Sequence, residues 1–134
     1  MKNHPRESYS VFEKKAKEHQ LASQYLFDQK AYDACVSVVC LSIINYMDAL
    51  SVNLFGKDNK GKNHEQAPIL LLQKLNRIGS SGFKALSYRI QKVLSLKNLA
   101  AYESRTVSRK EAAHSLTVLK EMIAYYNRNV QRTI

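Results

Sequence analysis

Residues 34–50 read ACVSVVCLSIINYMDAL, and this apolar stretch decides the fold. Apolar side chains occur nearly all round the helix that the stretch would form. This pattern predicts a central helix covered by neighbours on several sides. We expect the helix to span about 31–54 and to stop at Phe55-Gly56, because a glycine there can cap the carboxyl end of a helix.

Four further helices are predicted around the central one. Helical periodicity predicts the first at about 8–29 and the fourth at about 83–101. Residues 56–63 form a polar loop, after which Asn63 can cap the third helix with Gln66 as a reciprocal partner. The expected apolar residues of the third helix are Ile69, Leu70, Leu72, Leu75 and Ile78.

The last helix has the clearest start. Ser108-Arg109-Lys110-Glu111 fits the capping-box pattern, in which the two end residues cap each other's backbone. Only four glycines and two prolines interrupt the 134 residues, which argues against the many turns of an all-β fold. The sequence therefore predicts one all-α domain over the whole chain, an up-and-down helical bundle of about five helices.

The cysteines and the first residues bear on the compartment. Cys35 and Cys40 lie in the apolar stretch and would face different sides of a helix, so we expect two free core thiols, which suits a reducing compartment. The chain begins with a charged amphipathic segment that has no apolar stretch of signal-peptide type. Residues 34–50 are judged too short and too polar to span a bilayer. We therefore expect a cytoplasmic protein with no membrane partner.

The formal net charge is +10, and it is unevenly distributed. Between Glu65 and Glu103 there is no acidic residue. The basic residues in this block and just beyond it are Lys74, Arg77, Lys84, Arg89, Lys92, Lys97, Arg105, Arg109 and Lys110. A block of one sign can hold a positive potential over one face and attract a polyanion, which makes RNA or a nucleotide an expected partner. The alternative is that these are ordinary solvated helix faces of a basic protein.

Several classes of site are not predicted. The four histidines show no metal-ligand spacing with each other or with the cysteines. No Gly-rich phosphate loop, zinc finger or nucleophile elbow is present. We therefore expect no metal, no cofactor and no identifiable catalytic residue.

One lysine continues a buried stripe. On the fourth predicted helix, Leu86, Ile90 and Val93 form the expected buried face, and helical spacing leads from them to Lys97. A lysine on a buried face is costly unless it is paired or reaches a cleft. The pattern therefore singles out Lys97 as a candidate binding residue.

The central helix carries two polar residues of its own, Asn45 and Asp48. Our hypothesis is that Lys97 and Asp48 line the same crevice, with Asn98 and Tyr102 at its rim. The alternative is that the lysine reaches solvent at the end of the bundle and the aspartate faces water.

Three groups of short stretches follow one another along most of the chain. They are 31–34 (AYDA) leading into a helix that ends at 47–50 (MDAL), His64 with 69–72 (ILLL), and 94–102 (LSLKNLAAY) with 107–112 (VSRKEA). In these stretches the chain resembles the HEPN domains, helical bundles linked to RNA cleavage and to nucleotidyltransferase partners. The resemblance implies an HEPN-like bundle.

HEPN domains that cleave RNA carry an arginine, usually followed by asparagine, and a histidine after four to six intervening residues. The matching stretch here runs from Lys97-Asn98 to Tyr102, so lysine replaces the arginine and tyrosine replaces the histidine. Histidine titrates near neutral pH, whereas a tyrosine with an ordinary pKa of about 10 is a poor base there. Lysine keeps the charge but lacks the planar fork with which arginine grips phosphate. The resemblance therefore implies a non-catalytic or weakly active domain.

Arg109 and His114 also satisfy the bare motif. We discount this match, because Arg109 sits in the first turn of the capped last helix, downstream of where the family carries its motif. The predicted nucleic-acid-binding or nucleotide-binding residues are Lys97, Asn98, Tyr102, Arg89, Arg105 and Arg109, with Asp48 and Asn45 supporting the pocket.

The basic block and the resemblance together imply three alternative functions. The first is RNA or nucleotide binding through the basic face and the Lys97–Tyr102 end of the fourth helix. The second is a protein-interaction module, antitoxin-like or regulatory, for a nucleotidyltransferase-type partner. The third is an active ribonuclease in which Lys97 and Tyr102 stand in for the usual pair. The resemblance also implies a homodimer with the motif near its interface.

Overall fold

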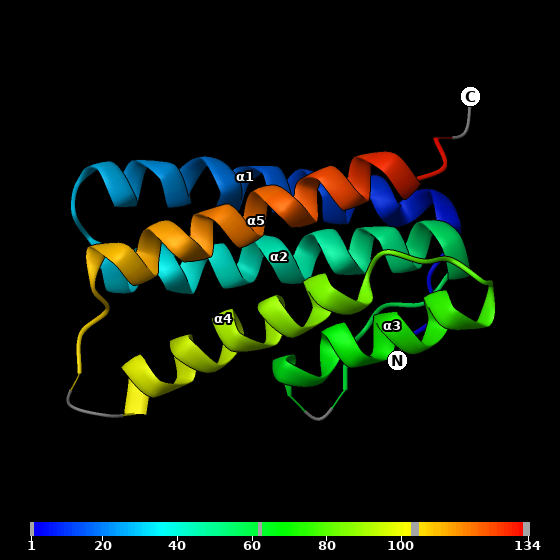
Figure 1. The fold of residues 1–134 in the computed structure, drawn as a ribbon. Helices are drawn as coiled ribbons and strands as arrows, with labels where there is room; N and C mark the ends of the chain where they lie inside the picture. The colour runs from blue at the N-terminus through cyan, green and yellow to red at the C-terminus, as the bar shows by residue number, and fades with distance from the viewer. Residues whose placement is uncertain (1, 62, 103–104, 133–134) are drawn as a thin grey trace.

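A computed structural model of the chain describes residues 2–61, 63–102 and 105–132. Within these ranges the chain forms five α-helices and two short 3-10 helices (Figure 1). They are η1 (Arg6–Ser8), α1 (Tyr9–Asp28), α2 (Tyr32–Phe55), η2 (His64–Gln66), α3 (Ala67–Arg77), α4 (Lys84–Tyr102) and α5 (Arg109–Asn129). The described ranges contain no strand, only an isolated bridge between Asn3 and Lys57. The predicted all-α helical bundle is therefore confirmed.

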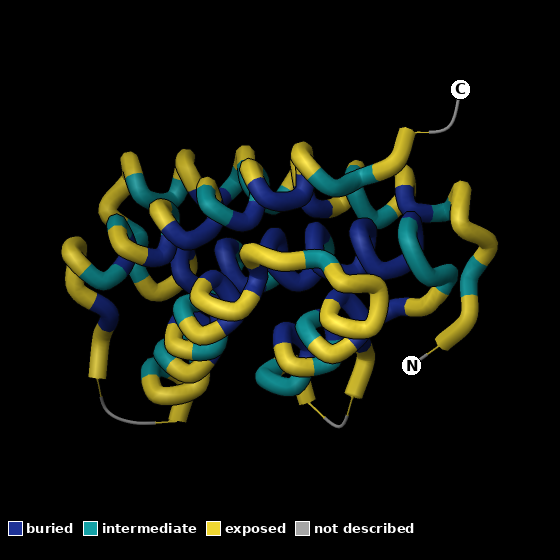
Figure 2. Tube along the Cα trace, turned by 45° about the vertical axis from the view of Figure 1, so that its right-hand side comes forward, coloured by how far each residue is buried: buried dark blue, intermediate teal, exposed yellow. Residues whose placement is uncertain are grey.

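α2 is the central helix, as the apolar stretch predicted. Fifteen of its 24 residues are buried. α1 and α5 cover it on one side, and α3 and α4 cover it on the other (Figure 1). The buried positions run through the middle of the molecule, while the outer helices expose one face each (Figure 2). A helix that is apolar nearly all round is thus buried by neighbours on both sides.

α2 is longer than the stretch at 34–50 from which a membrane span was excluded. With 24 residues, it is long and apolar enough to cross a bilayer by length and composition, so the judgement that it is too short and too polar was wrong. It is the one such helix in the described part of the chain, and 78% of its most apolar window is buried inside the bundle. The core helix of a soluble protein has this property, so the structure is compatible with a soluble protein. The cytoplasmic location stays a prediction.

Two helix ends predicted from side-chain chemistry are confirmed, the end of α2 at Gly56 and the start of α5 at Ser108. Gly56 follows α2 in the left-handed conformation, with a φ of 70°, and its N–H donates to the last turn of the helix. At the start of α5, Ser108 Oγ accepts from the Glu111 N–H, and a Glu111 carboxylate oxygen accepts from the Ser108 N–H, each at 3.1 Å. The predicted cap at Asn63 is wrong. This residue precedes η2, and its side chain makes no capping bond.

The apolar set predicted for α3 is only partly right: Leu75 is buried and Leu72 packs against the core. Ile69 and Ile78, expected in its apolar set, are 42% and 57% exposed. The buried residues of this helix are Ala67, Pro68, Leu71, Lys74 and Leu75. Because the run ILLL at 69–72 is apolar at every position, its pattern cannot select the buried face. Packing against α2 and α4 selects it instead.

Candidate nucleic-acid or nucleotide site

A pocket of about 220 Å³ lies beside the second half of α4. Its wall combines one residue of α2, the segment at η2 and four residues of α4. These are Ile44, Asn63, His64, Glu65, Leu94, Lys97, Asn98 and Tyr102, and we call this hollow the Lys97 pocket. Three of the predicted binding residues, Lys97, Asn98 and Tyr102, therefore come together in one place.

The packing of α4 carries Lys97 to this pocket. Leu86, Ile90 and Val93 are buried, as predicted, and hold one face of α4 against the bundle. Lys97 continues that face by one turn and is half-buried there. A lysine at the end of a buried stripe is tolerated when its charged head reaches a cleft, and the Lys97 pocket is such a cleft.

The pocket contains one ammonium group and one carboxylate, which do not form an ion pair with each other. The Asn98 amide donates to a carboxylate oxygen of Glu65 at 2.6 Å, which ties α4 to η2. Among the described residues, no carboxylate lies within ion-pair distance of the Lys97 ammonium. The lysine charge is therefore available to an anionic ligand.

The pocket wall includes residues that the predicted binding set omitted, among them His64. It lies in η2 and reaches the pocket only because the chain folds back from α2 to α4. No spacing to another site residue marks it in the sequence; only the family resemblance draws attention to it. His64 brings an imidazole, a group that can donate or accept hydrogen bonds, to the same wall as Lys97. The described residues contain no group of three or more His, Cys, Asp or Glu that could hold a metal ion.

The two residues predicted to support this pocket lie elsewhere. Asp48 is 3% exposed and accepts a 2.8 Å hydrogen bond from the backbone N–H of Asn59. Asn45 meets α1, with its amide nitrogen 3.1 Å from His19 Nδ1. The hypothesis of one crevice shared by Lys97 and Asp48 is therefore wrong. Because α2 is apolar nearly all round, its pattern does not show which neighbour each polar residue meets.

A buried polar cluster occupies the surroundings of Asp48. Lys74 of α3 enters it, and its ammonium donates to Ser51 Oγ and, at 3.0 Å, to the carbonyl oxygen of Asp58. Burial lowers the pKa of Lys74 to about 8, against the opposing effect of Asp48 and Asp58. Lys74 is 6% exposed, so it does not contribute to the basic surface that the charge pattern predicted.

The loop after α2 covers this cluster and is itself partly buried. The Asp58 carboxylate accepts from the backbone N–H of Lys2 and lies against His4 Nε2, both at 3.0 Å. Burial would raise the pKa of Asp58, but the hydrogen bonds from His4, Lys2 and Lys60 outweigh it, and the net pKa is lowered. The polar loop is thus a packed structural element held by the first residues of the chain.

The other predicted binding residues do not line the Lys97 pocket. Arg89 forms an ion pair with Glu121 of α5, and Arg105 forms one with Glu111. The guanidinium of Arg109 stands 5.1 Å from the centre of an aromatic ring of α1. Two arginines of the basic block are thus paired with glutamates of α5, which lie beyond the block along the chain.

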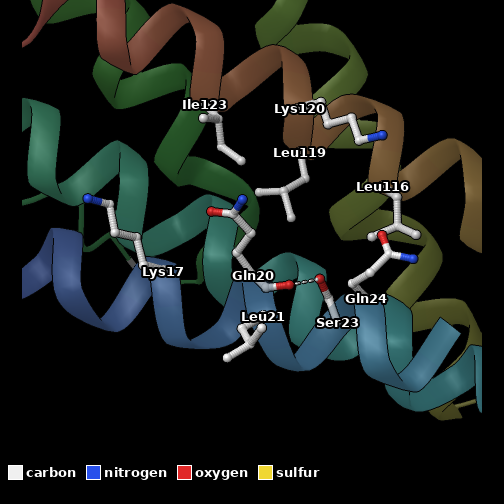
Figure 3. Close-up of a pocket in the computed structure, with 9 residues that line it drawn as sticks. All are labelled: Lys17, Gln20, Leu21, Ser23, Gln24, Leu116, Leu119, Lys120 and Ile123. Carbon is white, nitrogen blue, oxygen red and sulfur yellow. Dashed lines mark hydrogen bonds between the residues drawn. The ribbon is translucent and has the colours of Figure 1, made fainter. Parts of the chain in front are cut away.

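A larger hollow of about 490 Å³ lies between α1 and α5 (Figure 3). Leu116, Leu119 and Ile123 of α5 face α1 across it, and Lys17 and Lys120 stand at its edges. The described residues of its wall include no histidine and no carboxylate, so no group there is suited to proton transfer near neutral pH. We take the Lys97 pocket as the candidate site because it brings together three of the predicted binding residues, Lys97, Asn98 and Tyr102.

No protein-family model and no curated protein sequence matches this chain. The resemblance to HEPN domains therefore stays a prediction, and what it implies about activity and partners is a matter for proposals. The fold class stands independently of it, as an all-α helical bundle with a small polar pocket on α4.

Proposed function

We propose that this protein binds RNA or a nucleotide in the Lys97 pocket and cleaves it slowly or not at all. The observation that carries the proposal is the convergence of Lys97, Asn98 and His64 in a small pocket beside the exposed ring of Tyr102. A phosphate on the lysine and a base on the tyrosine would use both features together.

The pocket suits a phosphate group. An ammonium group offers three donors and binds phosphate as a point charge, and Lys97 has no carboxylate partner among the described residues. The volume of about 220 Å³ lies below the roughly 300 Å³ at which pockets begin to enclose drug-sized ligands. The pocket therefore encloses a phosphate and part of its sugar, and the base lies outside.

The ring of Tyr102 offers a surface on which a nucleotide base can stack. The side chain of Tyr102 is 87% exposed at the edge of the pocket. Stacking on an aromatic ring contributes about 1–3 kcal/mol per base and tolerates every base, because each base has a π-face. The net charge of +10 adds a general attraction for polyanions. We therefore expect salt-dependent binding with little sequence preference.

Slow RNA cleavage is a second candidate, and the position of His64 favours it. In such a reaction the ribose 2′-oxygen attacks the neighbouring phosphorus while an imidazole accepts its proton. The 5′-oxygen of the next nucleotide leaves and takes a proton from solvent. The products would carry 2′,3′-cyclic phosphate and 5′-hydroxyl ends.

The binding test is fluorescence anisotropy of a labelled single-stranded RNA across a salt series, with Lys97→Ala compared with Lys14→Ala. Lys14 is an exposed lysine of α1, and α2 lies between α1 and α4 (Figure 1). Each variant loses one charge, so the comparison tests where the charge is lost. Lys97→Ala should weaken binding about 3- to 10-fold at roughly 0.1 M salt and flatten the salt slope by about 0.7. Lys14→Ala should weaken it less than about twofold. Equal losses, or no binding at low salt, would refute the proposal.

A cleavage time course on the same RNA separates the two candidates. Cleavage that disappears in His64→Ala while binding persists would assign the proton transfer to His64. Cleavage undiminished in both His64→Ala and Tyr102→Phe would exclude both side chains from the reaction. If the wild-type protein binds and does not cleave, binding alone is the function.

The family resemblance adds two proposals about partners. A homodimer would bring two Lys97 pockets close together and form one composite anion-binding cleft. A nucleotidyltransferase-type partner would make this chain its regulatory, antitoxin-like subunit. Co-purification of such a protein, together with a lack of salt-sensitive RNA binding, would favour the interaction function over RNA binding.

A further inference from the structure

A second surface of α4 forms a groove with the beginning of α5. The hollow has a volume of about 820 Å³, and we call it the α4–α5 groove. Tyr88, Leu96 and Leu99 of α4 supply apolar surface in it, and Lys92 and Lys110 supply positive charge. Tyr88 is 53% exposed and Leu99 is 46% exposed, so the described part of the chain leaves this apolar surface uncovered.

The charges of the groove are unbalanced in favour of cations. Its one carboxylate among the described wall residues belongs to Glu111, which already accepts from Arg105 and from the backbone N–H of Ser108. No described carboxylate lies within ion-pair distance of Lys92 or Lys110. The groove thus combines apolar surface on α4 with two unpaired ammonium groups, Lys92 on α4 and Lys110 on α5, and is complementary to a ligand that carries both apolar and acidic side chains.

We propose that the α4–α5 groove binds an acidic amphipathic helix of a partner protein. Tyr88 to Leu99 spans eleven residue steps of α4, or about 16 Å, which matches roughly three turns of a docked helix. A helix of that length presents apolar side chains at i, i+3 or i+4, and i+7 to a groove. Acidic residues flanking that stripe would meet Lys92 and Lys110, and this charge match would steer the encounter and set the orientation.

Charge and chemistry disfavour the other occupants. A second copy docked through this same groove would bring Lys92 and Lys110 of both copies together. Nucleic acid would use the lysines but would leave the aliphatic floor of Leu96 and Leu99 without a matching surface. An amphipathic helix uses both parts of the groove.

The groove is separate from the Lys97 pocket, so the two proposals can fail independently. At about 100° per helical residue, Lys92, Leu96 and Leu99 share one side of α4, while Lys97 projects about 100° or more away from each of them, on the side that is buried against the bundle. The two sets of lining residues have no member in common. Lys97→Ala therefore serves as a control for the groove.

The experiment selects helix-forming peptides of about 16 residues from a randomised displayed library, with the wild-type protein as the target. Enriched peptides should carry an apolar stripe and net negative charge. Their affinity, measured by anisotropy, should fall about tenfold or more for the double variant Lys92→Glu/Lys110→Glu and for Leu99→Ser. Lys97→Ala should change it less than about twofold. Lack of enrichment, neutral or basic peptides, or equal losses in Lys97→Ala would overturn the proposal.

Two further measurements check where the peptide binds and whether the groove binds RNA instead. Chemical-shift mapping on the wild-type protein should place the peptide on the α4–α5 groove, so the assignment does not depend on the variants folding; shifts centred elsewhere would overturn it. Labelled single-stranded RNA is measured with the same variants. If RNA binding falls in Lys92→Glu/Lys110→Glu and the peptide does not compete with it, the groove is a nucleic-acid surface and the peptide proposal is wrong.

Discussion

Replacement of the buried Lys74 by methionine should change how the stability of this protein depends on pH. Lys74→Met keeps an apolar stem of similar length and removes the ammonium that donates to Ser51 Oγ and to the carbonyl oxygen of Asp58. Burial lowers the pKa of this lysine from 10.5 to about 8 in the folded protein. The wild-type protein therefore carries a pH-dependent contribution to stability that the variant lacks.

The sign and size of this effect follow from the two pKa values. Below about pH 8, the lysine is charged in both the folded and the unfolded chain, so its contribution does not vary with pH. Between about 8 and 10.5, the unfolded chain binds more protons than the folded one, and stability rises with pH. The full shift corresponds to about 3 kcal/mol, of which about 2 kcal/mol is gained between roughly pH 7 and pH 9.5.

The assay is urea unfolding of the wild-type protein, Lys74→Met and Lys84→Met at those two pH values. Lys84 is an exposed lysine of α4 and controls for the loss of a charge. Tyrosines and cysteines titrate in all three proteins, so their effects cancel in the differences. The free energy of unfolding of wild type relative to Lys74→Met should rise by about 2 kcal/mol at the higher pH, and the Lys84→Met difference should stay constant. A Lys74→Met difference that stays constant within about 0.5 kcal/mol would refute the reasoning.

Three shorter predictions concern a cap, the thiols and assembly. Ser108→Ala should lower the free energy of unfolding by about 1 kcal/mol in urea, because the Glu111 N–H loses its acceptor, whereas Ser108→Thr should keep most of it; an unchanged midpoint for the alanine variant would contradict the capping box. Cys35 and Cys40 should resist a thiol reagent until urea unfolds the protein, because burial raises their pKa values to about 11 and about 12; rapid labelling of folded protein would count against this burial. Light scattering should give about twice the chain mass of 15.3 kDa if the homodimer implied by the resemblance forms, and a monomer mass would exclude it.

The helices were predictable because their signals are local. α2 is apolar nearly all round, and Gly56 is free to adopt the left-handed conformation that ends it. Ser108 and Glu111 need only each other to begin α5. Asn63 fits the same type of pattern and failed, because η2 intervenes between it and α3.

The candidate site was only partly predictable. Lys97, Asn98 and Tyr102 lie within six consecutive residues of one helix, so their grouping on α4 could be inferred from spacing. His64 comes from another element, and nothing in the helical pattern connects it to Lys97. Asp48 was wrongly assigned to the same crevice. Because α2 is apolar nearly all round, its sequence pattern does not show which neighbouring element each of its polar residues faces.

The sequence by itself determined the helical class, the central place of α2 and the chemistry of two helix ends, since periodicity and capping depend on residues a few positions apart. Only the tertiary structure decided which charges face solvent. It buries Lys74 under the loop after α2, pairs Arg89 with Glu121, and leaves Lys97 open in a pocket. These outcomes depend on partners from distant parts of the chain, and burial changes the free energy of a charge far more than its position along a helix does.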